Sequence, residues 1–335
     1  MSCYVTIARN GWGATTLRLL MLGISCIALA HAASAQSLSS IQAAFVDPGI
    51  GTRQAAMGYA GTALTGVEGA SWNPASVARL PRLDVSMVYI DAFGVVPAGL
   101  AHVGFRTGRR WGLAVGLSES GDDVLQETTA EVVAARRFGP LSVGLGGRVL
   151  RAVFGRNALA PSDYQVFDPG EIEAGIARQV QGDALGFTLA AGAQYFAGRA
   201  AFAVVVRNPL SSVTWNSGSA AATNASYQEG LPLELVVGAA LPAGPRAQIL
   251  MDVRPALDPE LDHAVRVGAE WGPVPVITLR AGTERRFNGR GDDVLTAGFA
   301  LASPGTSTFR VIASYAYASS FLGLTQQVGI RMVLR

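Results

Sequence analysis

Apolar residues alternate with small or charged residues, with a period of two, along most of the chain after residue 81. In 264–271 one face carries Val265, Val267, Ala269 and Trp271, and the other face carries Arg266, Gly268 and Glu270. The runs at 276–284, 309–317 and 327–334 repeat this pattern. Successive side chains of a β-strand point to opposite faces, so the alternation predicts strands rather than helices.

The face that is not apolar consists mostly of Gly, Ala, Ser and Thr. A soluble sheet would expose a polar face to water, and a soluble domain has about 25% charged residues. Here 15% of the residues are charged, 50% are hydrophobic and the mean hydropathy is +0.31. After the N-terminus, no apolar stretch reaches the roughly 18 residues of a membrane-spanning helix. The chain is therefore predicted to be all-β: a transmembrane antiparallel up-and-down β-barrel.

The number of strands follows from the length of this region. Residues 82–335 number 335 − 81 = 254, and a spanning strand with its turn takes about 18 residues, which gives about 14 strands. The strand-like runs are 82–92, 98–107, 110–119, 127–138, 140–154, 169–180, 184–196, 199–208, 231–242, 245–254, 263–272, 275–286, 292–302, 307–318 and 325–334. Bacterial barrels have an even number of strands, so one run is expected to be a hairpin within a loop. The segments 155–169 and 208–231 are expected to be long loops.

The N-terminus has the features of a secretory signal peptide. An arginine-bearing start without acidic residues leads into an apolar run at 19–30, and Ala33-Ser34-Ala35 fits the small-residue cleavage rule. We predict that residues 1–35 are removed on export to the outer membrane of a Gram-negative bacterium. A retained anchor and a lipoprotein attached through Cys26 are the open alternatives.

The sequence offers few groups for catalysis or metal binding. Both cysteines, Cys3 and Cys26, fall in the predicted signal peptide. Without the two arginines of that segment the net charge is 26 − 2 − 24 = 0, which argues against a nucleic-acid partner. The acid pairs Asp122-Asp123 and Asp292-Asp293 fall in predicted loops without a nearby histidine, as solvated turn residues do. We predict no enzyme activity, cofactor or metal site; loose binding of a divalent cation by these acids is the open alternative.

Residues 52–75 form the most distinctive segment, from Thr52-Arg-Gln-Ala-Ala-Met-Gly-Tyr to Trp72-Asn-Pro-Ala75. The segment resembles the N-terminal region of the FadL-type outer-membrane transporter superfamily, and most closely the PorV/PorQ-type branch. There an Ala-Met-Gly-containing turn is followed about fifteen residues later by Asn-Pro-Ala. The matching positions are Arg53, Ala56, Met57, Gly58, Ala60, Ala63, Ala70, Trp72, Asn73, Pro74 and Ala75.

Later runs are also similar to that branch, among them Val267-Gly-Ala-Glu-Trp271 and Leu279-Arg-Ala-Gly282. The chain departs from the family pattern at Val67-Glu68-Gly69, where the family often has an acidic pair. It departs again at the C-terminus, which ends in Met332-Val-Leu-Arg335 without an aromatic residue. The similarity covers most of residues 50–335.

We predict that residues 36–80 form a plug or hatch segment and that 81–335 form the barrel. The candidate plug or gate residues are Arg53, Met57, Gly58, Trp72, Asn73, Pro74 and Ala75. Small residues let the backbone pack closely, and Asn before Pro suits a turn. The segment is either a moving gate or a static closure, and both interpretations stay open at this point.

Four charged residues are predicted to face the lumen: Arg266 and Glu270 on one strand, and Arg280 and Glu284 on the next. They could pair across the two strands, either as an internal brace or as a polar permeation path. Trp111, Trp271, Tyr315 and Tyr317 are candidates for the aromatic belts at the membrane interfaces.

The resemblance implies two functions. The first is passage of hydrophobic small molecules across the outer membrane. The alternative is a non-transporting outer-membrane component of a type IX protein secretion and surface-attachment system. The expected partners are therefore outer-membrane lipid together with hydrophobic small molecules or secretion-machinery proteins.

Overall fold

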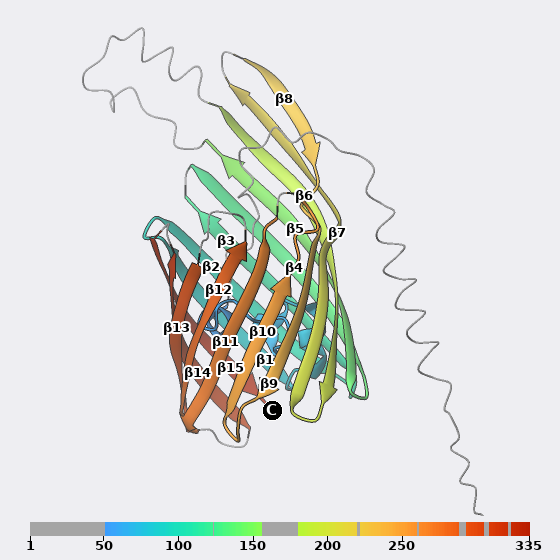
Figure 1. Ribbon diagram of the computed structural model, residues 1–335. Coiled ribbons are helices and arrows are strands. Elements are labelled where there is room, and N and C mark those ends of the chain that lie inside the picture. Colours follow the sequence, from blue (N-terminus) through green and yellow to red (C-terminus); the bar gives the residue numbers. More distant parts are fainter. Residues whose placement is uncertain are drawn as a thin grey trace, which may run out of the picture. The chain divides into compact units, whose positions relative to one another are not determined.

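The computed structural model describes residues 51–122, 124–155, 180–219, 222–259, 261–287, 293–304, 308–320 and 323–335 (Figure 1). These residues form one antiparallel sheet and three short helical segments. The strands are β1 (Leu83–Ala92), β2 (Val96–Thr107), β3 (Trp111–Gly121), β4 (Leu125–Phe138), β5 (Leu141–Phe154), β6 (Gln181–Ala197), β7 (Ala200–Ser219), β8 (Ala222–Glu229), β9 (Glu234–Pro242), β10 (Ala247–Arg254), β11 (His263–Val274), β12 (Ile277–Phe287), β13 (Asp293–Ala302), β14 (Phe309–Ser320) and β15 (Gly323–Leu334).

All of these strands except β8 close into a ring. Each strand from β1 to β7 pairs with the next, β7 pairs with β9, and the series continues to β15, which pairs back with β1. Strand β8 pairs with the second half of β7. The 15-stranded sheet minus β8 leaves 15 − 1 = 14 barrel strands. The prediction of an antiparallel barrel of about 14 strands is confirmed.

The expected loop at 208–231 is wrong. Strand β7 continues to Ser219, and β8 follows it at Ala222–Glu229. Asn208 and Pro209 look like a loop signal, but they form a bulge, where Asn208 has a φ of 56° and the β6–β7 register shifts. Pro209 is tolerated because that stretch of β7 has no ladder partner on its other side. The expected run at 169–180 and loop at 155–169 lie almost wholly outside the described residues.

The two faces of the wall differ as the alternation predicts. On β1, Met87 and Tyr89 are 59% and 58% exposed, whereas Val88 and Ile90 are 4% and 0% exposed. Large apolar side chains cover the outer face of every barrel strand in this way, which suits a hydrocarbon solvent. None of the helical segments in the described ranges is long and apolar enough to cross a membrane.

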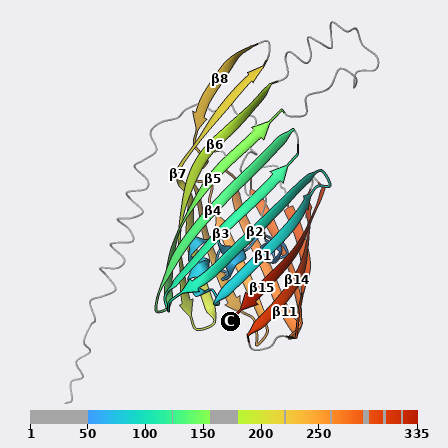
Figure 2. The ribbon, with the colours of Figure 1, turned by 180° about the vertical axis from the view of Figure 1, so that it is seen from behind.

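Residues 51–80 lie inside the ring, and we call them the hatch. They contain α2 (Thr52–Ala55), η1 (Val67–Gly69) and η2 (Pro74–Arg79), drawn in blue within the barrel in Figure 2. The side chain of Asn73 accepts a hydrogen bond from the backbone N–H of Ala75 at 2.9 Å and so caps η2. Residues 1–50, with the predicted signal peptide, lie outside the described residues.

The two ends of the barrel differ in their connections. At one end, Gly139-Pro140 alone separates β4 from β5, and Gly198-Arg199 alone separates β6 from β7. Strand β15 and the chain also end there, and we call it the short-turn end. At the opposite, long-strand end, β5, β6, β7 and β8 reach beyond the other strands (Figures 1 and 2).

Candidate functional site

The hatch fits against a belt of glycine residues that point inward from the wall. A methyl group at Gly282 would lie 2.2 Å from the carbonyl carbon of Met57, and one at Gly144 would lie 2.4 Å from the carbonyl carbon of Pro74. Side chains do not approach backbone so closely, so only glycine lets the hatch reach the wall here. The other members of this glycine belt are Gly104, Gly112, Gly192, Gly238, Gly268, Gly298 and Gly329.

Buried charges join the hatch to the wall. Asp84 on β1 is 0% exposed, and it accepts hydrogen bonds from Nε and Nη2 of Arg331 at 2.7 and 2.6 Å. The same carboxylate accepts from the backbone N–H of Val67 in the hatch at 3.2 Å. Arg53 in α2 donates to both oxygens of Glu270 on β11, at 2.9 and 2.8 Å. Displacing the hatch would break the bond from Val67 to Asp84 and the ion pair of Arg53 with Glu270, whereas Arg331 and Arg280 of the wall would stay paired with those carboxylates.

Asp252 on β10 holds a turn of the hatch. Its Oδ2 accepts hydrogen bonds from the backbone N–H groups of Gly61 and Thr62 and from the Thr62 hydroxyl, at 2.7–2.9 Å. Asn73 donates to the carbonyl oxygen of Thr62 at 3.0 Å. Wall and hatch thus satisfy each other's polar groups in the same region as the glycine belt.

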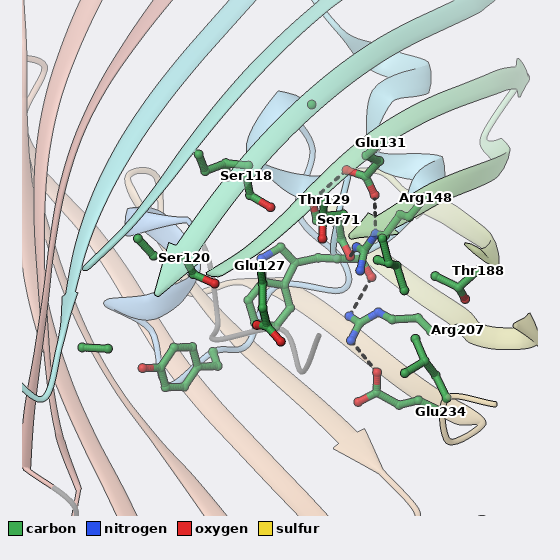
Figure 3. A pocket seen from close by; sticks show the side chains of 18 of the residues that line it. Ser71, Ser118, Ser120, Glu127, Thr129, Glu131, Arg148, Thr188, Arg207 and Glu234 are labelled. Carbon is green, nitrogen blue, oxygen red and sulfur yellow. Dashed lines mark hydrogen bonds and ion pairs between the residues drawn. The ribbon is translucent and has the colours of Figure 1, made fainter. Parts of the chain in front are cut away.

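Above the hatch, toward the long-strand end, the lumen contains a cavity of about 370 Å³ (Figure 3). Its floor includes Tyr59, Ser71 and Trp72 of the hatch, and its walls include apolar side chains such as Leu100 and Leu150. The charged side chains that line it are Glu127, Glu131, Arg148, Arg207, Glu234, Arg254, Arg266, Glu284 and Arg286. The cavity is therefore amphipathic, with aromatic and aliphatic surfaces beside fixed charges.

One polar cluster joins the cavity floor to β2, β4 and β5. Glu131 accepts from the Ser71 hydroxyl at 2.7 Å and from Nε of Arg148 at 2.9 Å. Arg148 also donates to the carbonyl oxygen of Ser71 at 2.7 Å. Nε2 of His102 lies 3.3 Å from Ser71 Oγ and 3.1 Å from Glu131 Oε2. A hydrolytic relay needs the hydroxyl and the carboxylate on opposite ring nitrogens, so this cluster positions the hatch and does not activate a nucleophile.

A second cluster surrounds Trp72. The guanidinium groups of Arg207 and Arg266 each lie 5.6 Å from the centre of its indole ring. Arg207 pairs with Glu234 at 2.6 Å and donates to the carbonyl oxygen of Trp72 at 2.8 Å. Arg266 pairs with Glu284 at 2.8 Å. Two wall arginines thus hold one aromatic ring of the hatch, an arrangement stabilised by cation–π attraction.

Tyr59 stacks on Trp72, with 6.4 Å between ring centres and 17° between ring planes. Burial raises the pKa of the Tyr59 hydroxyl to about 12, and the negative charge of Glu284 acts in the same direction. The cavity floor therefore presents a neutral phenol at any ordinary pH.

The cavity reaches the wall at the bulge of β7. The ladder of β7 with β9 ends at Arg207, and its ladder with β8 begins at Val213. Side chains close the gap between these ladders. Asn208 donates to the carbonyl oxygen of Pro232 at 3.0 Å, and the Ser211 hydroxyl accepts from a backbone N–H at 2.9 Å. Side-chain bonds therefore replace backbone pairing in this part of the cavity wall.

The structure places the candidate plug residues in four locations. Met57 and Gly58 contact the glycine belt, and Arg53 binds Glu270. Trp72 lies in the cavity floor. The Asn73-Pro74-Ala75 turn begins η2, and Pro74 packs against Gly144.

The four candidate lumen charges all face the interior, and the register of β11 and β12 sets Arg266 opposite Glu284 and Glu270 opposite Arg280. Each opposed pair is 2.8 Å apart. Arg266 and Glu284 line the cavity, whereas Glu270 and Arg280 lie at the level of the hatch, where Glu270 binds Arg53. These charges thus form two pairs, one lining the cavity and one at the level of the hatch.

Several site residues are missed by the sequence interpretation, above all His102, Glu131, Arg148, Arg207 and Glu234. Their one visible signal is a charged or imidazole side chain at an inward position of a strand that is otherwise apolar or small. Glu131, between Ala130 and Val132, is an example.

Within the described ranges, no group of three or more His, Cys, Asp or Glu residues could hold a metal ion. Asp122 accepts from the backbone N–H of Val124 at 2.8 Å, as a turn residue does. Asp123 and Asp292 lie outside the described residues.

Comparisons with known proteins support the fold. No protein-family model and no curated protein matches the sequence. Among solved structures, the CymD monoaromatic hydrocarbon channel is similar at a TM-score of 0.55 and 17% identity, covering 84% of this chain and 96% of that one. The Pseudomonas putida toluene transporter TodX is similar at 0.55 and 11%, covering 85% and 96%. A Pseudomonas aeruginosa FadL homologue is similar at 0.55 and 11%, covering 84% and 98%. The chain thus shares the barrel fold of these FadL-type structures, and none of the three distinguishes the PorV/PorQ-type branch.

Proposed function

We propose that this protein lies in the outer membrane and lets small, mainly apolar molecules pass across it through the cavity above the hatch. The observation that carries the proposal is the cavity itself, which combines aromatic and aliphatic surfaces within a closed barrel. Ligand sites of this kind are mostly apolar with a few fixed polar groups. Two of the similar structures are described as hydrocarbon channels or transporters, which supports the same class of cargo.

The long-strand end is the entrance in this proposal, because outer-membrane barrels place longer loops outside the cell and short turns in the periplasm. The hatch blocks the axial path through the lumen from the cavity to the short-turn end. In this proposal the exit is the wall at Asn208 and Pro232, where side-chain hydrogen bonds close a gap between the backbone ladders, whereas removal of the hatch would break its ion pair and its hydrogen bonds to the wall.

The alternative role as a component of a type IX secretion system has weaker support. The similar barrels are described as channels and transporters. Within the described residues, we find no separate surface feature that favours a secretion partner.

Neighbouring residues on β3 provide the test. Ser118 points into the cavity (Figure 3), and Leu117 is 55% exposed on the outer face. Ser118→Trp should fill much of the cavity, and Leu117→Trp places the same ring against lipid. We expect Gram-negative cells that express the protein to accumulate radiolabelled toluene faster than cells without it. Ser118→Trp should abolish this gain and Leu117→Trp should retain it. No gain from the unchanged protein, or equal uptake by both variants, would contradict the proposal.

A further inference from the structure

Arginine side chains gather at the short-turn end of the barrel. Seven of them are exposed there: six at the turns and strand ends, Arg82, Arg106, Arg109, Arg110, Arg199 and Arg246, and a seventh, Arg335, at the end of the chain. We call the six residues at the turns and strand ends the arginine rim. No acidic side chain in the described ranges is largely exposed beside them: Asp84 is buried and paired with Arg331, and Glu270 is 16% exposed and paired with Arg53 and Arg280. At the long-strand end, by contrast, exposed Asp122 and Asp183 accompany the arginines.

Outward-facing aromatic residues show the depth at which the arginine rim lies. Trp111 and Trp271 are 44% and 54% exposed near the short-turn end of their strands. Arg110 directly precedes Trp111, and a neighbouring guanidinium, that of Arg136, lies 5.3 Å from the Trp111 ring centre. The backbone N–H that follows Trp271 donates to the carbonyl oxygen of Arg246. Aromatic belts of this kind mark the headgroup level of a bilayer, so the rim lies at the depth of lipid phosphates.

The chemistry of the rim suits phosphate. The guanidinium group binds phosphate oxygens in a bidentate way that an ammonium group cannot reproduce, and the chain contains no lysine. The side chains of Arg106, Arg109 and Arg110 form no hydrogen bond or ion pair with other described residues, so their donors are available. Excess positive charge at the surface of an anionic leaflet is attracted to it.

We propose that the arginine rim binds the phosphate groups of anionic phospholipids in the leaflet next to the short turns. The proposal needs the barrel to lie in a bilayer, and it does not depend on what the cavity transports. The rim would then fix the depth of the barrel in the membrane and keep a ring of anionic lipids around its short-turn end.

The two exposed tryptophans allow a direct test. The refolded protein is placed in phosphatidylcholine vesicles that contain either bromine-labelled phosphatidylglycerol or bromine-labelled phosphatidylcholine, and quenching of tryptophan fluorescence is measured. Trp271→Phe leaves Trp111 as the exposed reporter, and Trp111→Phe leaves Trp271; the other tryptophans are common to every protein compared. Beside each reporter tryptophan, we expect the anionic lipid to be enriched about fivefold over phosphatidylcholine. This is the enrichment that the attraction of one basic residue to an anionic bilayer produces. High salt should weaken this preference.

A local variant supplies the internal control. In R106Q/R109Q/R110Q/R136Q, which also removes the guanidinium beside the Trp111 ring, the preference at Trp111 should fall close to one, whereas the preference at Trp271, beside the unchanged Arg246, should stay. Arg151→Gln at the long-strand end should change neither reporter. Equal quenching by both lipids at low salt would overturn the proposal and favour an acidic soluble partner for the rim. A preference at Trp111 that survives in the variant without these four arginines would also overturn it.

Discussion

The lower half of the lumen, toward the short-turn end, and the upper half, toward the long-strand end, contact the hatch in different ways. In the lower half, wall glycines such as Gly282 leave no room for a side chain, and hatch backbone fills the barrel. In the upper half, long side chains such as Arg207 and Glu131 reach the hatch from the wall and leave a cavity between them. The lower half thus combines a close backbone fit with buried ion pairs, whereas the upper half leaves a cavity between the charged side chains that reach the hatch.

The buried pair between Asp84 and Arg331 should show the largest effect. Asp84→Asn leaves the Arg331 guanidinium without its counter-charge in the lower lumen, and removal of one partner of a buried pair costs about 3–5 kcal/mol. Asp293→Asn is the matched control, because Asp293 and its partner Arg285 are 51% and 62% exposed at 3.6 Å, where a pair contributes about 0–1 kcal/mol. Urea unfolding in detergent micelles measures both variants. Equal losses would mean that the lower lumen is not a dry, tightly closed region.

The glycine belt should give the next effect. Gly282→Ala forces the Met57 backbone away from β12, and overpacking of this kind costs about 1–3 kcal/mol. Gly99→Ala on β2 is the control, since a methyl group there would meet no atom within 4 Å. Its unfolding free energy should change by at most about 0.5 kcal/mol. If both alanine variants unfold at the same urea concentration, the belt does not hold the hatch.

Tyr59, at the boundary between the two halves, should give the smallest effect. Below pH 10 its hydroxyl is protonated in the folded and the unfolded chain. Between pH 10 and about 12 the unfolded chain ionises while the folded chain does not, because burial raises the pKa of Tyr59 to about 12. Stability should therefore fall as pH rises through this window. The fall should be shallower in Tyr59→Phe, measured by urea unfolding at pH 9, 10 and 11. Parallel curves for the two proteins would show that the Tyr59 hydroxyl is not buried in the cavity floor.

The features that are local in sequence could be predicted, and those that depend on closure of the ring could not. Alternation identifies each barrel strand that the structure describes. In an antiparallel hairpin, the numbers of opposed residues have a constant sum. The Arg266–Glu284 and Glu270–Arg280 pairs have the same sum, so both contacts follow from the β11–β12 hairpin alone. The contact between Arg331 and Asp84 needs the ring to close between β15 and β1.

The cavity clusters were missed for the same reason. His102 reaches Glu131 across the intervening strand β3, where Gly116 leaves space for its ring. A contact between two strands that are not neighbours produces no periodic pattern in the sequence. The extension of β7 was missed because Asn208-Pro209 has the composition of a turn, although it forms a bulge held by the neighbouring strand β6.

A reversible cross-link tests the central claim that the hatch stays in place. Thr52 in α2 and Ser314 on β14 have hydroxyl oxygens 2.6 Å apart, so Thr52→Cys together with Ser314→Cys can join the hatch to the wall. The sequence has no other cysteine beyond the predicted signal peptide. With the disulfide formed, the account expects toluene accumulation equal to that of the reduced protein and of each single-cysteine variant. Loss of accumulation on oxidation, with recovery on reduction, would show that the hatch moves out as a gate and would contradict the account.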